Sequence, residues 1–304
     1  MANHIQRIKS ISEYHQLREL PMPQHPLISL INFDTVKYLT DEPTTWVMDF
    51  YSIAMKRNFG TKIKYGQQEY DFDEGILFFI SPGQVFSVEV DKRKPFNPSG
   101  WMLMVHPDFL WNTSLAKTIK QYEYFDYAVN EALFLSPKEE ATLVNVLQNI
   151  EHEYHSNIDK FSQDVIIAQL ELLLTYADRF YHRQFLTRKI SNHKILNQLE
   201  EVLNNHFSDE EMISKGLPTV QLIAEKLNIS QNYLGSLLKV LTGQSTQQHI
   251  HDKLIEKAKE KLSTTSLSVS EIAYELGFEH SQSFSKLFKT KSGVSPLEFR
   301  QSFN

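Results

Sequence analysis

The sequence of 304 residues contains no cysteine, and that absence excludes several classes of protein. Without thiols the chain has no disulfides, no sulfur ligands for zinc, no thiolate nucleophile and no thiol redox sensor. The first twenty residues carry scattered charges and no long apolar run, so they predict neither a signal peptide nor a membrane-spanning helix. We therefore expect a cytoplasmic protein with no membrane partner.

Residues typical of metal and enzyme chemistry are also scarce. Segment 46–105 contains no histidine, so no cluster of cupin-type metal ligands is expected there. The His-Glu-Tyr-His run at 152–155 has a histidine spacing of three, whereas a zinc-protease helix needs four, and His249 and His251 fall on different helical faces. No P-loop, nucleophile elbow or dinucleotide fingerprint is present. We predict no metal, no cofactor and no catalytic residue.

The net charge of −6 is unevenly distributed along the chain. From Lys215 onward, eleven Lys or Arg stand against eight Asp or Glu, which leaves −9 for the preceding residues. An excess this small gives little support for a polyanionic partner, so the pattern of residues has to carry that inference. The length favours two domains with helical connecting material.

The first third of the chain reads as an antiparallel sheet that closes into a small barrel or sandwich. Turn signals such as Ser81-Pro82-Gly83 separate its apolar runs. The predicted strands are Trp46–Ile53, Thr61–Tyr65, Ile76–Ile80, Val85–Val90 and Trp101–Val105.

Helices are predicted from Ser136 onward, where a capping residue, a proline and an acidic first turn follow one another. Apolar residues recur at helical spacing in 143–150 and again in 165–173, and a third helical stretch covers 195–207. A dimer seam is one interpretation of the second stripe, and packing against the chain's own sheet is the other. That stripe consists of Ile166, Leu170, Leu173 and Tyr176 to Phe180.

The last hundred residues contain an internal repeat. Four apolar residues in 220–227 recur 49 residues later in 269–276, at positions i, i+3, i+4 and i+7 of one helical face in both copies. With an offset of fifty, Leu-Leu-Lys at 237–239 corresponds to Leu-Phe-Lys at 287–289, and a glycine follows in each copy. The same two-helix arrangement is therefore used twice.

Each copy reads as a helix, a tight turn and a second helix, which is the order of a helix-turn-helix unit. Ser230 suits the N-cap of one second helix, and Gly277 supplies the positive φ that the other turn needs. Residues 246–262 form a helical spacer. At about 1.5 Å per residue it spans on the order of 25 Å, less than the roughly 34 Å between successive major-groove faces, so reading both grooves predicts a bent duplex.

These residues resemble the AraC/XylS family of bacterial transcription regulators over roughly 196–300. The second copy follows the family signature in order: Ile272-Ala273, Gly277-Phe278, Phe284 to Lys289, Gly293 to Pro296 and Phe299-Arg300. The first copy keeps Tyr233-Leu234 and Lys239 but has Ser236 where the family usually has arginine. An arginine there would contact phosphate or guanine, so we expect the second unit to dominate binding.

The resemblance implies an N-terminal cupin-like barrel that receives an effector or mediates dimerisation, and segments 80–84 and 100–107 look like those of such domains. It also implies double-stranded promoter DNA as the partner and transcription activation as the commoner role. RNA polymerase, an unknown small-molecule effector and a second copy of the chain are the further partners that it suggests.

The residues expected to contact DNA lie on the outward faces of the two second helices. Gln and Asn can make bidentate contacts to adenine, and Lys can reach guanine or phosphate. The alternative is a set of merely solvated polar positions. The predicted residues are Gln231, Asn232, Gly235, Ser236 and Lys239 in the first unit, and Ser281, Gln282, Ser285, Lys286 and Lys289 in the second.

The predicted fold is an α+β two-domain protein with a cupin-like β-barrel and following helices, then an all-α domain of two helix-turn-helix units joined by a linker helix. The expected divisions are a regulatory domain over 1–135, a helical connector over 136–192 that could mediate dimerisation, and a DNA-binding domain over 193–304. The predicted function is sequence-specific transcription regulation. The alternatives are a regulator that needs no ligand, and a cupin-like binding protein or enzyme with an incidental helical tail.

Overall fold

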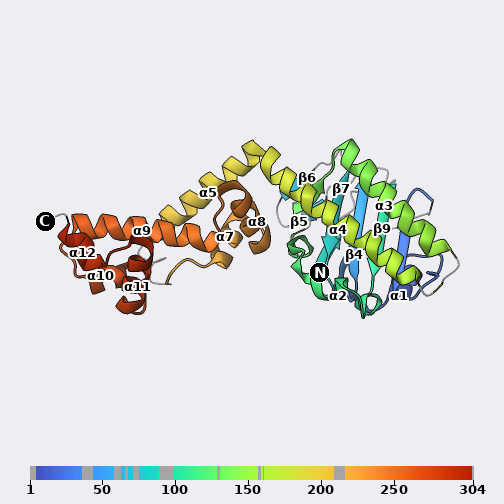
Figure 1. The fold of residues 1–304 in the computed structure, drawn as a ribbon, viewed down its shortest axis with the longest axis horizontal. Coiled ribbons are helices and arrows are strands. Elements are labelled where there is room, and N and C mark those ends of the chain that lie inside the picture. Colours follow the sequence, from blue (N-terminus) through green and yellow to red (C-terminus); the bar gives the residue numbers. More distant parts are fainter. Residues whose placement is uncertain are drawn as a thin grey trace. The chain divides into compact units, whose positions relative to one another are not determined.

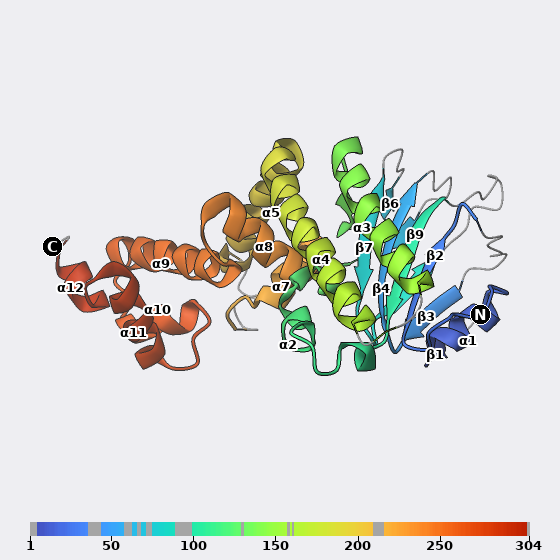
Figure 2. The same cartoon turned by 45° about the vertical axis from the view of Figure 1, so that its right-hand side comes forward.

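The computed structural model of the protein describes residues 5–35, 44–57, 63–65, 68–70, 75–88, 99–128, 131–156, 159, 161–208 and 216–302. The chain divides into two compact units, Met1–Gln184 and Phe185–Asn304, which are described separately as the N-terminal unit and the C-terminal unit (Figures 1 and 2). Within the described ranges, no helix is long and apolar enough to cross a membrane. The assignment of 136–192 as a separate connector stays a prediction.

The N-terminal unit contains ten described strands and helices on either side of them. Its strands are β1 (Ile5–Ile8), β2 (Ile28–Asn32), β3 (Thr44–Met48), β4 (Tyr51–Arg57), β5 (Ile63–Tyr65), β6 (Gln68–Tyr70), β7 (Ile76–Ile80), β8 (Val85–Val88), β9 (Ser99–Val105) and β10 (Leu133–Phe134). Its helices are α1 (Ile11–Leu17), η1 (Pro107–Leu110), α2 (Leu115–Thr118), η2 (Ile119–Gln121), η3 (Glu123–Asp126), α3 (Pro137–His155) and α4 (Ser162–Thr187), of which the last continues into the C-terminal unit.

The strands form two sheets that face each other. The larger has the order β10-β7-β4-β9-β2 and is antiparallel, the smaller has the order β1-β3-β8, and β5 and β6 form a separate hairpin. Alternate residues such as Ala54 and Met104 point into the core between the sheets, where α1 also packs. The opposite face is covered by helices α3 and α4 (Figure 2), where the ring of Phe79 lies 6.5 Å from that of Tyr181.

The described strands do not close into a barrel, so the cupin-like barrel is not confirmed. The run 46–53, predicted as one strand, is two strands in different sheets, because the chain turns at Asp49 and Phe50. The predicted strands Ile76–Ile80 and Trp101–Val105 are confirmed as β7 and most of β9. Parts of the other two predictions, 61–62 and 89–90, lie outside the described residues.

The predicted start of α3 at Ser136 is confirmed, and it anchors the helix layer. Ser136 and Glu139 form a reciprocal capping box, in which the Ser136 N–H donates to Glu139 Oε2 at 2.9 Å. The same carboxylate receives Arg183 Nη2 of α4 at 2.7 Å. Burial by itself raises the pKa of Glu139, but the hydrogen bonds from Ser136 and Arg183 outweigh it and lower that pKa. The carboxylate therefore holds α3 and α4 together.

The prediction that the apolar stripe of α4 forms a dimer seam is wrong. Ile166, Leu170, Leu173 and Phe180 are buried within the chain itself. Helix α4 contacts the larger sheet and the segments beside it, since the ring of Tyr181 lies 6.5 Å from that of Phe79 and the Tyr124 hydroxyl donates to the Leu174 carbonyl at 2.8 Å. The alternative interpretation, packing against the chain's own sheet, is the one that the structure supports.

The C-terminal unit is entirely helical in its described residues. Its helices are α5 (Lys189–Ser208), α7 (Val220–Leu227), α8 (Gln231–Thr242), α9 (Thr246–Thr264), α10 (Val269–Glu275), α11 (Ser281–Ser292) and α12 (Pro296–Gln301). They surround two apolar cores. The first core joins α5, α7 and α8, and the second joins α10, α11 and α12.

A single helix, α9, contributes to both cores of this unit. Ile250 belongs to the first core, whereas Leu254, Ile255, Ala258 and Leu262 belong to the second. Figure 1 shows α9 running from α8 to the α10–α12 group. The predicted all-α domain of two units joined by a linker helix is thus confirmed, and α5 adds a second connection because Phe207 lies in the second core.

Two glycines with positive φ allow a prediction about the stability of this unit. Gly243 (φ +74) ends α8 with nothing within 4 Å of an added Cβ, whereas at Gly277 (φ +89) a Cβ would lie 3.0 Å from the Gly216 carbonyl carbon. We expect Gly243→Ala to cost about 1 kcal/mol from backbone strain alone. Gly277→Ala should cost roughly 1–3 kcal/mol more, because backbone rather than a flexible side chain must move.

Denaturant unfolding of the full chain, followed by helical circular dichroism, would measure both losses. The two variants are matched in chemistry and in backbone region, and they differ in the space around the new methyl group. Equal shifts of the unfolding midpoint would contradict the close packing of the second turn against residues 216–217.

Candidate nucleic-acid interface

The first helix-turn-helix unit consists of α7 and α8, and its turn is fixed by capping groups. The Thr219 hydroxyl accepts the Leu222 N–H, and Asn228 ends α7 in the left-handed region at φ 54. The predicted N-cap Ser230 then accepts the Tyr233 N–H at 3.2 Å. The apolar residue Leu234 of α8 is fully buried in the first core.

The second unit repeats this arrangement with α10 and α11. Ser268 and Glu271 form a capping box at the start of α10, and Gly277 adopts the predicted positive φ in the turn. Phe284 and Phe288 on α11 are fully buried, and their rings contact each other. We refer to α8 and α11 as the recognition helices.

The structure places the ten predicted DNA-contacting residues on the recognition helices, on the sides opposite the two cores. Eight of them lie in matching rows, because 232, 235–236 and 239 on α8 and 282, 285–286 and 289 on α11 are about one turn apart in succession. The exposed members are Gln231, Asn232, Lys239, Gln282, Lys286 and Lys289. The half-buried members are Gly235, Ser236, Ser281 and Ser285.

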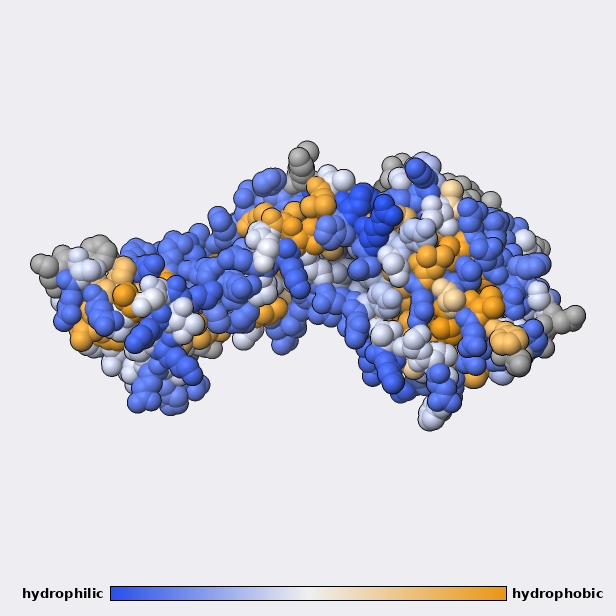
Figure 3. All heavy atoms as spheres, in the orientation of Figure 1, coloured by the Kyte–Doolittle hydropathy of each residue, from blue (hydrophilic) through white to orange (hydrophobic). Residues whose placement is uncertain are grey.

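The lysines of this unit fall into two groups according to their partners. Three of the four on the linker helix form salt bridges within the protein, which are Lys253–Glu256 at 2.8 Å, Lys257–Glu260 at 2.9 Å and Lys261–Glu275 at 2.6 Å. Lys239, Lys286 and Lys289 form no salt bridge with any described residue. Their charges are therefore available to an external anion, on a unit whose visible face is largely hydrophilic along α9 (Figure 3).

Residues that orient α11 were not identified from the sequence. Asp252 on α9 accepts Lys291 Nζ of α11 at 2.8 Å and Gln244 Nε2 at 2.9 Å. Burial alone raises the pKa of Asp252, but the bonds and charge of Lys291 and the bond from Gln244 lower it overall. Asp252 and Lys291 are 39 residues apart. A pair so far apart in the sequence cannot be predicted from a local sequence pattern.

The arginine at the end of the family signature also has a structural partner. Arg300 Nε of α12 donates to the Leu262 carbonyl, near the end of α9, at 3.1 Å. This bond satisfies a carbonyl at the helix C-terminus and ties α12 to the linker helix. Arg300 therefore acts in the positioning of the second unit.

The described residues contain no group of three or more His, Asp or Glu side chains placed to hold a metal ion. The two histidines of α9 have separate partners. His249 Nε2 lies 2.9 Å from Thr242 Oγ1, and His251 Nε2 lies 2.9 Å from Gln247 Nε2. Burial lowers the pKa of both histidines.

Comparison with known proteins places this unit in context. A family described as a helix-turn-helix domain matches residues 223–302. The raffinose operon transcriptional regulatory protein RafR of Pediococcus pentosaceus is 31% identical over 46% of this chain and 48% of its own length. The transcriptional activator RhaS of Escherichia coli is 31% identical over 46% of this chain and 46% of its own length. The chain thus spans about half the length of these curated relatives.

Among solved structures, the C-terminal domain of the response regulator AraT from Geobacillus stearothermophilus is 32% identical to this chain. The match covers 36% of this chain and 84% of that domain, with a TM-score of 0.32. The helix-turn-helix family and these relatives agree with the signature residues of α10–α12. Residues 223–302 thus form a helix-turn-helix domain of the AraC type.

Proposed function

We propose that the protein binds duplex promoter DNA in a sequence-specific manner through α8 and α11, and that it thereby regulates transcription. The observation that carries the proposal is the pair of matched recognition helices on one linker helix. Each has a buried apolar face and an outward row of amide, hydroxyl and ammonium groups. These are the groups that read base edges and neutralise phosphates.

The side chains of the two rows indicate how much each recognition helix contributes to the affinity for DNA. Gln282 on α11 and Asn232 on α8 can each form bidentate bonds to adenine, and Lys286 and Lys289 can reach guanine or phosphate. On α8, Ser236 offers only a hydroxyl at the position where the family resemblance leads us to expect arginine. We therefore assign most of the affinity to the second unit.

The linker helix sets the spacing of the two contacts. Helix α9 has 19 residues, which at about 1.5 Å each gives on the order of 28 Å, less than the roughly 34 Å between major-groove faces of straight DNA. Simultaneous reading of two adjacent grooves on this spacing requires the duplex to bend towards the protein.

The regulatory part of the proposal concerns the N-terminal unit. It would receive a small-molecule effector, or pair two chains, and so shift the population of arrangements competent to bind DNA. Activation through RNA polymerase is the mode that we favour, since one relative is named a transcriptional activator. Such a protein would act in the cytoplasm, where it meets promoter DNA. The buried residues of α4 are excluded as a dimer seam, so pairing would need other residues.

Selection of duplex DNA from a random pool by the purified full chain, followed by sequencing, tests DNA recognition. We expect a motif about two helical turns long. The double variant Gln282→Ala, Lys286→Ala should lose the α11 half of that motif and lower the affinity by roughly 10- to 1000-fold, because it removes an adenine contact and a phosphate or guanine contact.

The matched control is Lys257→Ala, which removes one positive charge from the linker helix, where that lysine already pairs with Glu260. It should leave the selected motif unchanged. Failure of the folded wild-type chain to enrich any sequence at low salt would contradict the proposal. If Lys257→Ala and the double variant lost the same affinity for DNA, the contribution of α11 would be non-specific electrostatic attraction rather than recognition of bases.

A gain-of-function variant tests the division of work between the helices. Ser236→Arg on α8 should raise the affinity for the selected site by about 10-fold, through one new guanine or phosphate contact. Ser263→Arg, which adds the same charge near the end of α9, should raise it much less. Affinities measured by fluorescence anisotropy at several salt concentrations would separate a specific gain from added charge. Equal gains from both variants would contradict a role for α8 in the groove.

A further inference from the structure

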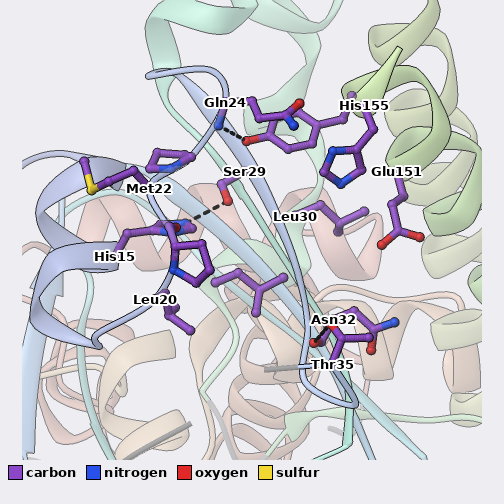
Figure 4. Close-up of a pocket in the computed structure, with 14 residues that line it drawn as sticks. His15, Leu20, Met22, Gln24, Ser29, Leu30, Asn32, Thr35, Glu151 and His155 are labelled. Carbon is purple, nitrogen blue, oxygen red and sulfur yellow. Dashed lines mark hydrogen bonds between the residues drawn. The ribbon is translucent and has the colours of Figure 1, made fainter. Parts of the chain in front are cut away.

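A pocket of about 240 Å³ lies at the edge of the larger sheet in the N-terminal unit, far in sequence from the recognition helices. It is formed by the segment that follows α1, by the edge strand β2 and by the C-terminal turns of α3 (Figure 4). Its volume suits a compact molecule built on one ring. Nothing in the proposed DNA recognition uses this pocket.

The walls of the pocket are held in place by buried hydrogen bonds. His15 Nδ1 donates to the Pro21 carbonyl at 2.5 Å, which leaves Nε2 to accept the Ser29 hydroxyl at 2.8 Å. Burial lowers the pKa of His15, although the Pro21 bond opposes this, and the lowered pKa favours the neutral ring with this tautomer. On the other side, the Gln24 N–H donates to the Tyr154 hydroxyl at 2.6 Å. The pocket is therefore preformed.

The chemistry of the lining is asymmetric. Apolar surface comes from Leu20, Leu30 and the neighbouring prolines, while Glu151 and His155 project from successive turns of α3 on the side opposite His15 (Figure 4). Glu151 forms no ion pair or hydrogen bond with any described residue. No lysine or arginine lines the pocket, so a single carboxylate sets the sign of its charge.

We infer that this pocket binds a compact organic cation. A protonated amine of the ligand would pair with Glu151, and its apolar body would pack on Leu20 and Leu30. The Asn32 side chain accepts the Asp34 N–H through its oxygen, which leaves its amide N–H groups for a ligand hydroxyl or carbonyl. A carboxylate beside apolar walls favours a cation over a neutral or anionic molecule of equal shape, because only the cation neutralises the partly desolvated charge.

Binding here goes beyond DNA recognition, and only its regulatory meaning rests on the proposed function. An occupant would bridge β2 and the end of α3. Because α3 begins at the Glu139–Arg183 bond to α4, and α4 continues into the C-terminal unit, such an occupant would act on the helix layer that leads to the DNA-binding unit. This provides a physical location for the effector.

Three probes of one shape and different charge test the inference on the full chain at neutral pH. Cyclohexylamine, cyclohexanol and cyclohexanecarboxylate are each titrated while binding is followed by protein-observed NMR, without DNA. We expect cyclohexylamine to bind in the millimolar range that a fragment of this size allows, cyclohexanol at least 10-fold more weakly, and the carboxylate not at all.

The variant Glu151→Gln should weaken cyclohexylamine binding at least 10-fold and leave cyclohexanol binding unchanged. The control Glu153→Gln, on the same helix but outside the lining, should leave both unchanged. Absence of cyclohexylamine binding by the folded chain, or equal affinity for the amine and the alcohol, would overturn the inference. So would equal effects of the two glutamine substitutions. Because the readout contains no DNA, these outcomes are distinguishable from a failure of DNA recognition.

Discussion

The C-terminal unit depends on one constraint, which is that the same helix completes two hydrophobic cores. Ile250 of α9 fills the first core and Leu254 to Leu262 fill the second, so neither core is complete without α9. Because the cores hold α8 and α11, the separation of the recognition helices follows from the length of α9. The Asp252–Lys291 and Arg300–Leu262 bonds join α9 to α11 and α12 and so help to orient the second unit on the linker helix. Two surfaces that could otherwise bind independently are thereby presented as one.

The N-terminal unit provides a different kind of surface. Its sheets and helix layer leave a small preformed pocket at a sheet edge, with one carboxylate and neutral polar groups around it. Lys239, Lys286 and Lys289 of the recognition helices carry positive charges without a salt bridge to any described residue, whereas Glu151 of the pocket carries a negative charge without one. The two proposals together give a protein that combines recognition of a polyanion with recognition of a small cation, and helix α4 continues from the first unit into the second.

The sequence predicted the helical half of the protein better than the sheet half, for physical reasons. Helix periodicity, serine caps and positive-φ glycines are local signals, and Ser136, Ser230 and Gly277 each perform the role expected of them. Sheet pairing is non-local. The run 46–53 is mostly apolar, and it contains no glycine or proline to mark the turn at Asp49 that sends its halves into different sheets. The pocket was missed because it joins residues 15–35 to 151–155.

The most direct test of the central claim is hydroxyl-radical footprinting of the full chain on its selected DNA site. If α9 fixes α8 and α11 as one two-part reader, the protected sugars will form two patches on one face of the duplex. These patches will lie about one helical turn, roughly 10 base pairs, apart. Protection of a single groove segment, with the second patch absent at saturating protein, would contradict the account.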